Sequence, residues 1–256
     1  MVVYGALDSV VQKGLFSRLY YRVFGVPHFG SHVRFRYLKP YVSTSKGERV
    51  LDLGCGDGTL LNLMAYQYGC TGVGVDRLPE RVKKAERVRD TFKINVKYHI
   101  SDIYSYLNSM RFDKFDKIFL TEVLEHVIEP VAVITAVARL LEKDGQIFVT
   151  VPAIRESSRN SLSPTAFSYG QDRHIRDGLS YLQIQELAHK ANLKLLTTTV
   201  TFGPQKQKLW EISDRIRRRS QLAYAFVLPC MRALAKLESW VPIDRAYGFL
   251  IVLNNK

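Results

Sequence analysis

From residue 50 onward, short apolar runs alternate with segments whose apolar residues recur at helical spacing. The apolar runs predict strands at residues 50–53, 71–75, 96–100, 116–120 and 146–151. The periodic segments predict helices at residues 59–68, 79–90, 102–109, 130–142 and 180–191. Two later apolar runs predict strands at 193–202 and 246–253. This alternation predicts an α/β fold in which helices cover both faces of a largely parallel sheet.

The segments outside this alternation have patterns of their own. Residues 6–24 and 31–42 space their apolar groups helically, which predicts helices in an N-terminal cap over residues 1–48. These helices could close over a ligand or could pack as ordinary core. We divide the rest into a core at 49–202 with an insertion at 152–178, a basic amphipathic insertion at 203–245, and a last core strand at 246–256.

The insertion at 203–245 mixes basic and apolar residues. The apolar side of its first part is formed by Leu209, Trp210, Ile212 and Ile216. Residues 222–231 carry no charge, and this run is too short to cross a bilayer. Such a pattern suits contact with an anionic membrane surface through residues 206–240, a channel for an apolar substrate, or a helical cap over the sheet edge.

The run Arg49–Gly58 carries the most specific chemistry. It combines an apolar strand with a loop of three glycines, and glycine lets backbone N–H groups approach a ligand closely. The loop has no Gly-Lys-Ser/Thr ending, and its acids Asp52 and Asp57 would repel a pyrophosphate but attract a cation. Asp76 ends the next predicted strand, where an acid suits ribose hydroxyls.

This run resembles the (V)LDxGCGxG strand-loop of the class I S-adenosylmethionine (SAM) dependent methyltransferases. Glu122–His126, with residues 140–145 and 148–152, resembles the small-molecule, ubiquinone-biosynthesis-like branch, although Lys143–Gln146 departs from the usual Lys-Pro-Gly-Gly turn. The resemblance implies a Rossmann-like, doubly wound, seven-stranded, mostly parallel sheet with an antiparallel last strand. It implies SAM as cofactor, held by Asp52, Gly54, Cys55, Gly56, Asp76, Arg77, Asp102, Ile103 and Glu122.

The Glu122–His126 run also raises the question of a metal. Glu122, Glu125 and His126 would share one face of a helix, and with His174 they could bind Mg²⁺ or Mn²⁺, as some relatives do. We favour the interpretation without a metal, because the run is widespread in the family without one. His126 and His174 are then the candidate general bases, and His28 and His32 are further candidates.

The net charge of +13 is unevenly distributed. Residues 49–151 carry as many basic as acidic side chains, so all the excess lies in the two flanking segments. Positive flanks attract nucleic acid, a phospholipid surface or an acidic substrate. The three scattered cysteines form no disulfide framework, and no secretory signal or apolar run of membrane-spanning length is present. We therefore expect a cytoplasmic protein, with peripheral attachment to the inner face of the membrane as an option.

The sequence thus predicts an enzyme that transfers a methyl group from SAM to a small-molecule or lipid-like acceptor, at oxygen or carbon. An RNA-modifying methyltransferase is an alternative that the basic flanks favour. The lack of an RNA-binding module and of an Asn/Asp-Pro-Pro-Tyr motif makes nucleic acid the weaker choice. A non-catalytic SAM-fold protein docked on a membrane or partner is the other alternative.

Overall fold

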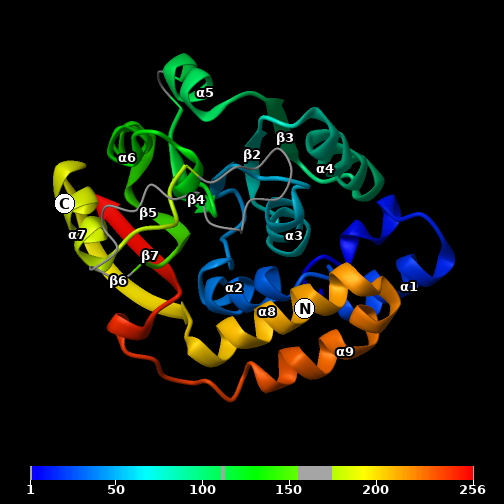
Figure 1. Ribbon diagram of the computed structural model, residues 1–256. Helices are drawn as coiled ribbons and strands as arrows, with labels where there is room; N and C mark the ends of the chain where they lie inside the picture. Colours follow the sequence, from blue (N-terminus) through cyan, green and yellow to red (C-terminus); the bar gives the residue numbers. More distant parts are fainter. Residues whose placement is uncertain (1, 111–112, 155–174, 256) are drawn as a thin grey trace.

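The computed structural model describes residues 2–110, 113–154 and 175–255. A twisted seven-stranded sheet runs through the molecule in the order β3-β2-β1-β4-β5-β7-β6 (Figure 1). Its strands are β1 (Arg49–Leu53), β2 (Thr71–Asp76), β3 (Val96–Ile100), β4 (Phe115–Thr121), β5 (Leu141–Pro152), β6 (Leu193–Phe202) and β7 (Gly248–Asn255). Only the β7 pairings, with β5 and β6, are antiparallel among these described strands. The predicted Rossmann-like sheet is confirmed.

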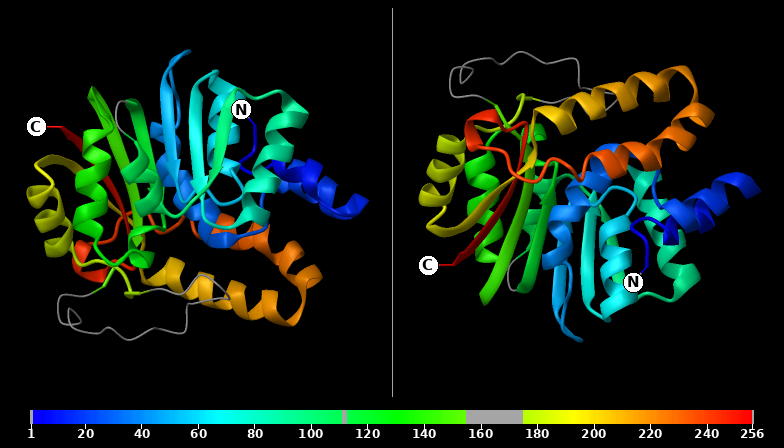
Figure 2. Two further views of the ribbon diagram at one scale, coloured as in Figure 1. Left: turned by 90° about the horizontal axis from the view of Figure 1, so that it is seen from above. Right: turned by 90° about the horizontal axis from the view of Figure 1, so that it is seen from below.

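Helices cover both faces of the sheet, as the alternating sequence predicted (Figures 1 and 2). One face carries α2 (Phe29–Leu38), α3 (Thr59–Tyr68) and α4 (Pro79–Phe92), and the other carries α5 (Ile103–Ser109), α6 (Pro130–Arg139) and α7 (Tyr181–Lys190). Successive side chains of a strand point to opposite faces. Phe119 and Phe148 accordingly pack with α3, whereas Ile118 and Ile147 pack with α6.

The N-terminal cap is more broken than its periodicity predicted. The single helix expected over 6–24 is wrong, because a 3₁₀ helix (η1, Leu7–Val11) precedes α1 (Leu15–Phe24). Gly14 separates them with φ +84, a left-handed conformation that no α-helix contains. The second helix starts earlier than predicted, since His28 Nδ1 accepts the Ser31 N–H at 3.2 Å, and it continues into η2 (Lys39–Tyr41).

Strand β5 also begins earlier than predicted. The helix expected to reach residue 142 ends at Arg139, and the strand starts at Leu141. Leu141 is already paired with Phe115 of β4, whose N–H donates to Leu140 O at 2.8 Å. The register then shifts before Lys117, so the early part of β5 is irregular and lacks the alternation that marks a strand.

The segment between β6 and β7 forms a helical hairpin. It consists of α8 (Pro204–Arg219) and α9 (Gln221–Leu234), followed by η5 (Ile243–Arg245). The hairpin packs on α2 through a separate apolar cluster that joins Phe29 and Val33 to Tyr224 and Leu228. Within the described part of the chain, no helix has the length and apolarity needed to cross a membrane. Most of the predicted insertion at 152–178, including residues 155–174, lies outside the described residues.

Candidate active site

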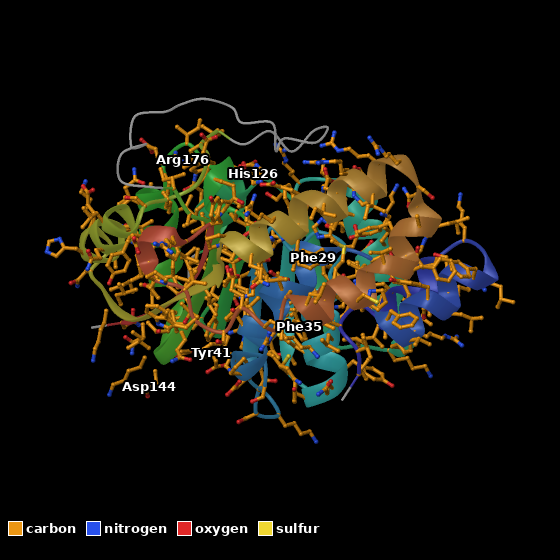
Figure 3. The ribbon with its side chains drawn as sticks, turned by 60° about the horizontal axis from the view of Figure 1, so that its bottom comes forward. Phe29, Phe35, Tyr41, His126, Asp144 and Arg176 are labelled. Atoms are coloured by element: carbon orange, nitrogen blue, oxygen red, sulfur yellow. The ribbon has the colours of Figure 1, made fainter. Side chains whose placement is uncertain are left out.

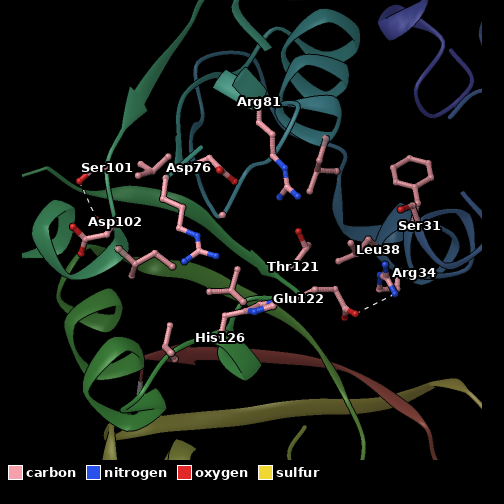
Figure 4. Close-up of a pocket in the computed structure, with 18 of the residues that line it drawn as sticks. Ser31, Arg34, Leu38, Asp76, Arg81, Ser101, Asp102, Thr121, Glu122 and His126 are labelled. Carbon is pink, nitrogen blue, oxygen red and sulfur yellow. Dashed lines mark hydrogen bonds and ion pairs between the residues drawn. The ribbon is translucent and has the colours of Figure 1, made fainter. Parts of the chain in front are cut away.

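A cavity of about 450 Å³ opens where β1, β2 and β4 end (Figure 4). Open α/β sheets bind their ligands at this edge. Figure 3 shows His126 and Arg176 there, whereas Asp144 lies toward the opposite edge. Seven residues predicted from sequence line the cavity: Gly54, Asp76, Arg77, Asp102, Ile103, Glu122 and His126. Asp52, Cys55 and Gly56 lie in the surrounding wall without lining it.

The glycine loop is folded tightly against the neighbouring strands. The Gly54 and Cys55 N–H groups both donate to Val75 O, at 2.8 and 3.0 Å. Gly54 has φ +72, and a Cβ there would lie 2.6 Å from the Val123 side chain, which leaves no room for any other residue. The loop therefore exposes backbone at the cavity mouth just before α3 begins.

Asp76 joins this loop to the end of β2. Its Oδ2 accepts the Gly56 N–H and its Oδ1 accepts the Leu78 N–H, both at 2.9 Å. A carboxylate offers about four acceptor positions, so each oxygen keeps capacity for one more donor. Asp76 points into the cavity (Figure 4) and can accept two adjacent hydroxyl groups there.

Asp52 lies behind the loop and is only 1% exposed. Its Oδ1 has no hydrogen-bond partner among the described residues. Burial, and then the nearby Asp76 carboxylate, raise the pKa of Asp52 to about 8. Burial likewise raises the pKa of the Cys55 thiol, which stays neutral. A cation bound beside Asp52 would favour its ionised form, so the acid behind the loop suits a positively charged ligand.

Glu122 begins the loop after β4 in an unusual conformation, with φ +56. Left-handed backbone at a non-glycine residue costs about 1–3 kcal/mol and persists where surrounding contacts hold it. Here Glu122 Oε2 pairs with Arg34 Nη1 at 3.1 Å, and Thr150 Oγ1–H donates to Oε1 at 3.1 Å. The ion pair, dashed in Figure 4, links the N-terminal cap to the floor of the cavity.

The α-helical face that would unite Glu122, Glu125 and His126 is not formed. A short 3₁₀ helix (η3, Leu124–His126) follows the left-handed Glu122 instead, because β4 ends there. His126 consequently lines the cavity, whereas Glu125 is fully buried and neither of its carboxyl oxygens has a hydrogen-bond partner among the described residues.

Burial, and then Glu122, raise the pKa of Glu125 well above its usual range. The fourth residue of the alternative metal set, His174, lies outside the described residues. Within the described ranges, no three His, Cys, Asp or Glu side chains form a group able to hold a metal ion. Because His174 is not among the described residues, a metal ion in this site stays the alternative prediction.

Asp102 and Ile103 stand where β3 leads into α5. Asp102 caps that helix by accepting the Ser105 N–H at 2.9 Å, and hydrogen bonds from Ser105 lower the pKa of Asp102. The exposed carboxylate also borders the cavity, and Ile103 follows it with an apolar surface. One side chain thus both caps the helix and faces the cavity.

The N-terminal cap supplies cavity residues that sequence reasoning did not name. They are Tyr4, Ser31, Arg34, Phe35 and Leu38, joined by Arg81 from α4. The four α2 members recur at intervals of three and four residues and so share one face of that helix. The opposite face of α2 contacts α9 through Phe29 and Val33. Helix α2 therefore covers the cavity with one face and packs in an apolar cluster with the other.

The histidines of the cap do not line the cavity. His28 caps α2 with its Nδ1, and His32 Nε2 lies 2.8 Å from Val26 O. Burial lowers the pKa of His28 to about 4 and that of His32 to about 3, so both are neutral near pH 7. Their contacts are those of structural residues.

The seven-stranded sheet and the cavity at its carboxyl edge, which Asp76, Asp102 and Glu122 line, are typical of α/β proteins that bind a nucleoside-type ligand there. A family model described as a methyltransferase domain matches residues 44–212. The chain belongs to this family, the class I SAM-dependent methyltransferases.

Two of the similar curated proteins carry the same name. The chain is 39% identical over 123 residues to a ubiquinone biosynthesis O-methyltransferase of Xylella fastidiosa (strain M23), which covers 48% of this chain and 49% of the relative. It is 32% identical over 124 residues to the enzyme of the same name from Actinobacillus pleuropneumoniae, which covers 47% of this chain and 53% of the relative. The chain thus matches about half the length of these relatives.

Solved structures share the fold. A geranyl diphosphate C-methyltransferase from Streptomyces coelicolor aligns with a TM-score of 0.61 at 14% identity, covering 88% of this chain and 81% of that chain. Phosphoethanolamine N-methyltransferase 2 of Haemonchus contortus aligns with a TM-score of 0.57 at 21% identity, covering 88% of this chain and 52% of that chain. At these identities the likeness shows the fold alone.

Proposed function

We propose that the protein transfers the methyl group of SAM to a small-molecule or lipid-like acceptor, at an oxygen or a carbon atom. The observation that carries the proposal is the set of acids around one cavity. Asp76 keeps acceptor capacity at the cavity wall, and the buried Asp52 behind it lacks a partner for one oxygen among the described residues. Carboxylates in these positions match hydroxyl groups and a cation on one ligand.

The residues present fit SAM, and each has a definable role. Asp76 would bind the ribose hydroxyls, while Asp102 and Ile103 would receive the adenine amino group and ring. Asp52 and Glu122 would lie toward the cationic end. Arg77 would border the ribose, and Cys55 and Gly56 would shape the loop wall. A cavity of about 450 Å³ is within the usual range for such a ligand.

Bound SAM supplies an activated methyl group, so the protein mainly has to align the acceptor and exclude water. The Arg34–Glu122 ion pair fixes the Glu122 carboxylate and holds α2 over the site. His126, which lines the cavity, is the described candidate to accept a proton from an acceptor hydroxyl group. His174 keeps that role as a prediction from the sequence.

A small or lipid-like acceptor is supported by the apolar part of the cavity, where Phe35 and Leu38 of α2 lie. Two relatives act, by name, in ubiquinone biosynthesis. These names favour an acceptor with an apolar tail. We further propose that residues 206–240 contact an anionic membrane surface, which would place the protein at the inner face of a membrane.

Radiolabelled SAM incubated with the protein and a metabolite extract tests the function directly. We expect label in the lipid or small-molecule fraction. Label in RNA instead would favour the nucleic-acid alternative. Binding of SAM without label transfer to any fraction would favour the non-catalytic alternative, and absence of SAM binding would overturn the proposal.

The cofactor assignment is tested by Asp76→Ala. We expect this change to abolish SAM binding measured by titration calorimetry, because no other side chain at the end of β2 replaces both acceptor oxygens. Asp76→Asn keeps the size and one carbonyl oxygen and should bind at least tenfold more weakly than the native protein. Asp144→Ala, at the opposite sheet edge, is the matched control. Unchanged affinity in a folded Asp76→Ala protein would remove this residue from the cofactor site.

A further inference from the structure

Helix α1 exposes the side of its surface that an amphipathic helix normally buries. Leu15 is 74% exposed, Leu19 50% and Val23 59%. Their spacing of four residues places them in one stripe along the helix. Among the ten residues of α1, only Tyr20 is buried. An apolar stripe left open on a surface helix marks a site of interaction.

Helix α9 is apolar on both of its sides. Its inner side, with Tyr224, Leu228 and Met231, packs on α2 and β6. Its outer side carries Leu222, which is 63% exposed, and Phe226, which is 72% exposed, followed by the exposed Cys230. A helix that is hydrophobic all round is normally buried by a further layer. Beyond its end, Leu237 and Trp240 are 70% and 80% exposed.

The two helices are neighbours, so their stripes belong to one region of the surface. Tyr20 Oη–H donates to Ala225 O at 3.1 Å, and Arg232 Nη1 donates to Phe24 O at 2.6 Å. Figures 1 and 2 show α1 beside the α8–α9 turn, at the end of the molecule away from α7. We name this region the α1–α9 face and define it by Leu15, Leu19, Val23, Leu222 and Phe226.

The charged residues of α1 and α9 are all basic. Residues 9–47, which include α1, contain seven Lys or Arg and no Asp or Glu. Residues 215–237, which include α9, contain six Lys or Arg and no acid. Arg217 and Arg218 pair with Asp214, so their charge is already partly neutralised. Exposed basic residues near the apolar stripes include Lys13, Arg18, Arg22, Arg219 and Lys236.

We propose that the α1–α9 face docks on an anionic phospholipid surface, with the apolar side chains entering the boundary between headgroups and acyl chains. Exposed apolar stripes on two helices whose own charged residues are all basic match an interface with an apolar interior and a negatively charged surface. A second copy of this face would need acids facing these cations, and both helices lack acids.

This docking rests on the membrane contact proposed above for residues 206–240, but it narrows that contact to α9 and adds α1 to it. The position of α9 relative to the cavity suggests what the docking is for. Helix α2 lies between α9 and the cavity, with Phe29 and Val33 on one side and Arg34 and Phe35 on the other. A docked membrane would therefore be separated from the cavity by α9 and α2, and the docking would bring a bilayer that holds an acceptor with an apolar tail near the site.

Vesicle flotation with the full chain tests the proposal. The vesicles are phosphatidylcholine with or without phosphatidylglycerol, and a sizing column checks the oligomeric state without vesicles. We expect the native protein to float with the anionic vesicles only, and less at high salt. Leu19→Glu combined with Phe226→Glu should lower the bound fraction about tenfold or more. The control, Leu182→Glu, changes a 47% exposed residue of α7 at the far end and should float like the native protein.

Titration of SAM on the same preparations separates this proposal from the proposed function. Native protein that binds SAM but stays out of anionic vesicles overturns the docking and leaves the methyltransferase function standing. Native protein that floats without binding SAM does the reverse. Flotation unchanged in a folded Leu19→Glu, Phe226→Glu protein overturns the α1–α9 face. A native dimer that the same variant converts to a monomer assigns the face to a second copy and also overturns the proposal.

Discussion

At the scale of single residues, two buried carboxyl groups make the protein depend on pH. Asp52 should affect ligand binding, and Asp8 should affect stability. The pKa of Asp52 is raised to about 8, so its carboxyl group is mostly neutral at pH 7 in the free protein. Cationic SAM favours the ionised form, and binding must then release a proton. Affinity should rise as pH rises from 6 toward 8, by up to about tenfold per pH unit.

Titration calorimetry in two buffers of different ionisation enthalpy measures this proton release. Asp52→Asn should bind SAM more weakly and lose the part of the proton release that belongs to Asp52. The amino group of SAM contributes equally to both proteins, so the difference between them isolates the carboxyl group. Equal proton release by native and variant proteins would mean that Asp52 does not face the cation.

Asp8 predicts a pH effect on stability rather than on binding. It is 4% exposed, Thr59 Oγ1–H donates to its Oδ2 at 2.7 Å, and burial raises its pKa to about 7 from 3.8. Between these values the unfolded chain releases the proton and the folded protein keeps it. The free energy of unfolding should therefore fall as pH rises through this window, by about 3 kcal/mol between pH 5 and 8.

Asp8→Asn keeps an acceptor for Thr59 and cannot ionise. Urea unfolding measures the free energy of unfolding of both proteins at pH 5 and pH 8. The value for the variant minus the value for the native protein should be larger at pH 8 than at pH 5. Parallel pH dependence of the two proteins would contradict the raised pKa of Asp8.

At the scale of elements, the carboxylate of Glu238 connects the end of the helical hairpin to the start of α8. Glu238 accepts the N–H groups of Gly203, Gln205 and Lys206 at the start of α8, at 2.8 to 3.3 Å. It also pairs with the Lys206 ammonium at 3.3 Å, and Lys206 is only 1% exposed. Glu238→Ala should destabilise the protein by about 3–5 kcal/mol, because it leaves a buried ammonium without its counter-charge.

Thermal unfolding of a double variant checks this explanation. Glu238→Ala combined with Lys206→Met removes both charges and should recover part of the lost stability. The matched surface control is Glu186→Ala, which breaks an exposed pair with Lys190 and should cost less than about 1 kcal/mol. A double variant less stable than Glu238→Ala alone would show that Lys206 tolerates the loss of its partner.

The elements also show how far sequence patterns reach. The strands and the glycine loop could be predicted because apolar runs and glycines report local needs, such as burial at Val50 and a left-handed turn at Gly54. The roles of α2 could not be predicted, because Arg34 pairs with Glu122, which lies 88 positions further along the chain. The early start of β5 was missed for a related reason, since its first pairing, Leu141 with Phe115, breaks the regular register.

At the scale of the whole molecule, the N-terminal cap joins three parts that are distant in sequence. Asp8 bonds to Thr59 at the start of α3, Arg34 pairs with Glu122 after β4, and Phe29 packs on α9. The cap forms part of the cavity wall, because Tyr4 and Arg34 line the cavity. A ligand in the cavity must therefore stabilise the cap as well as the glycine loop.

Hydrogen–deuterium exchange with and without SAM tests this coupling. A ligand at a hundred times its Kd stabilises the state that binds it by about 2.7 kcal/mol, which slows exchange that requires opening of that state. We expect slower exchange in α2 and in the loop at 54–58, because both border the cavity. Helix α7 contributes no lining residue and serves as the internal reference. Protection of the loop without α2 would mean that the cap packs on the core independently of the cofactor, and that Arg34 holds the fold rather than the site.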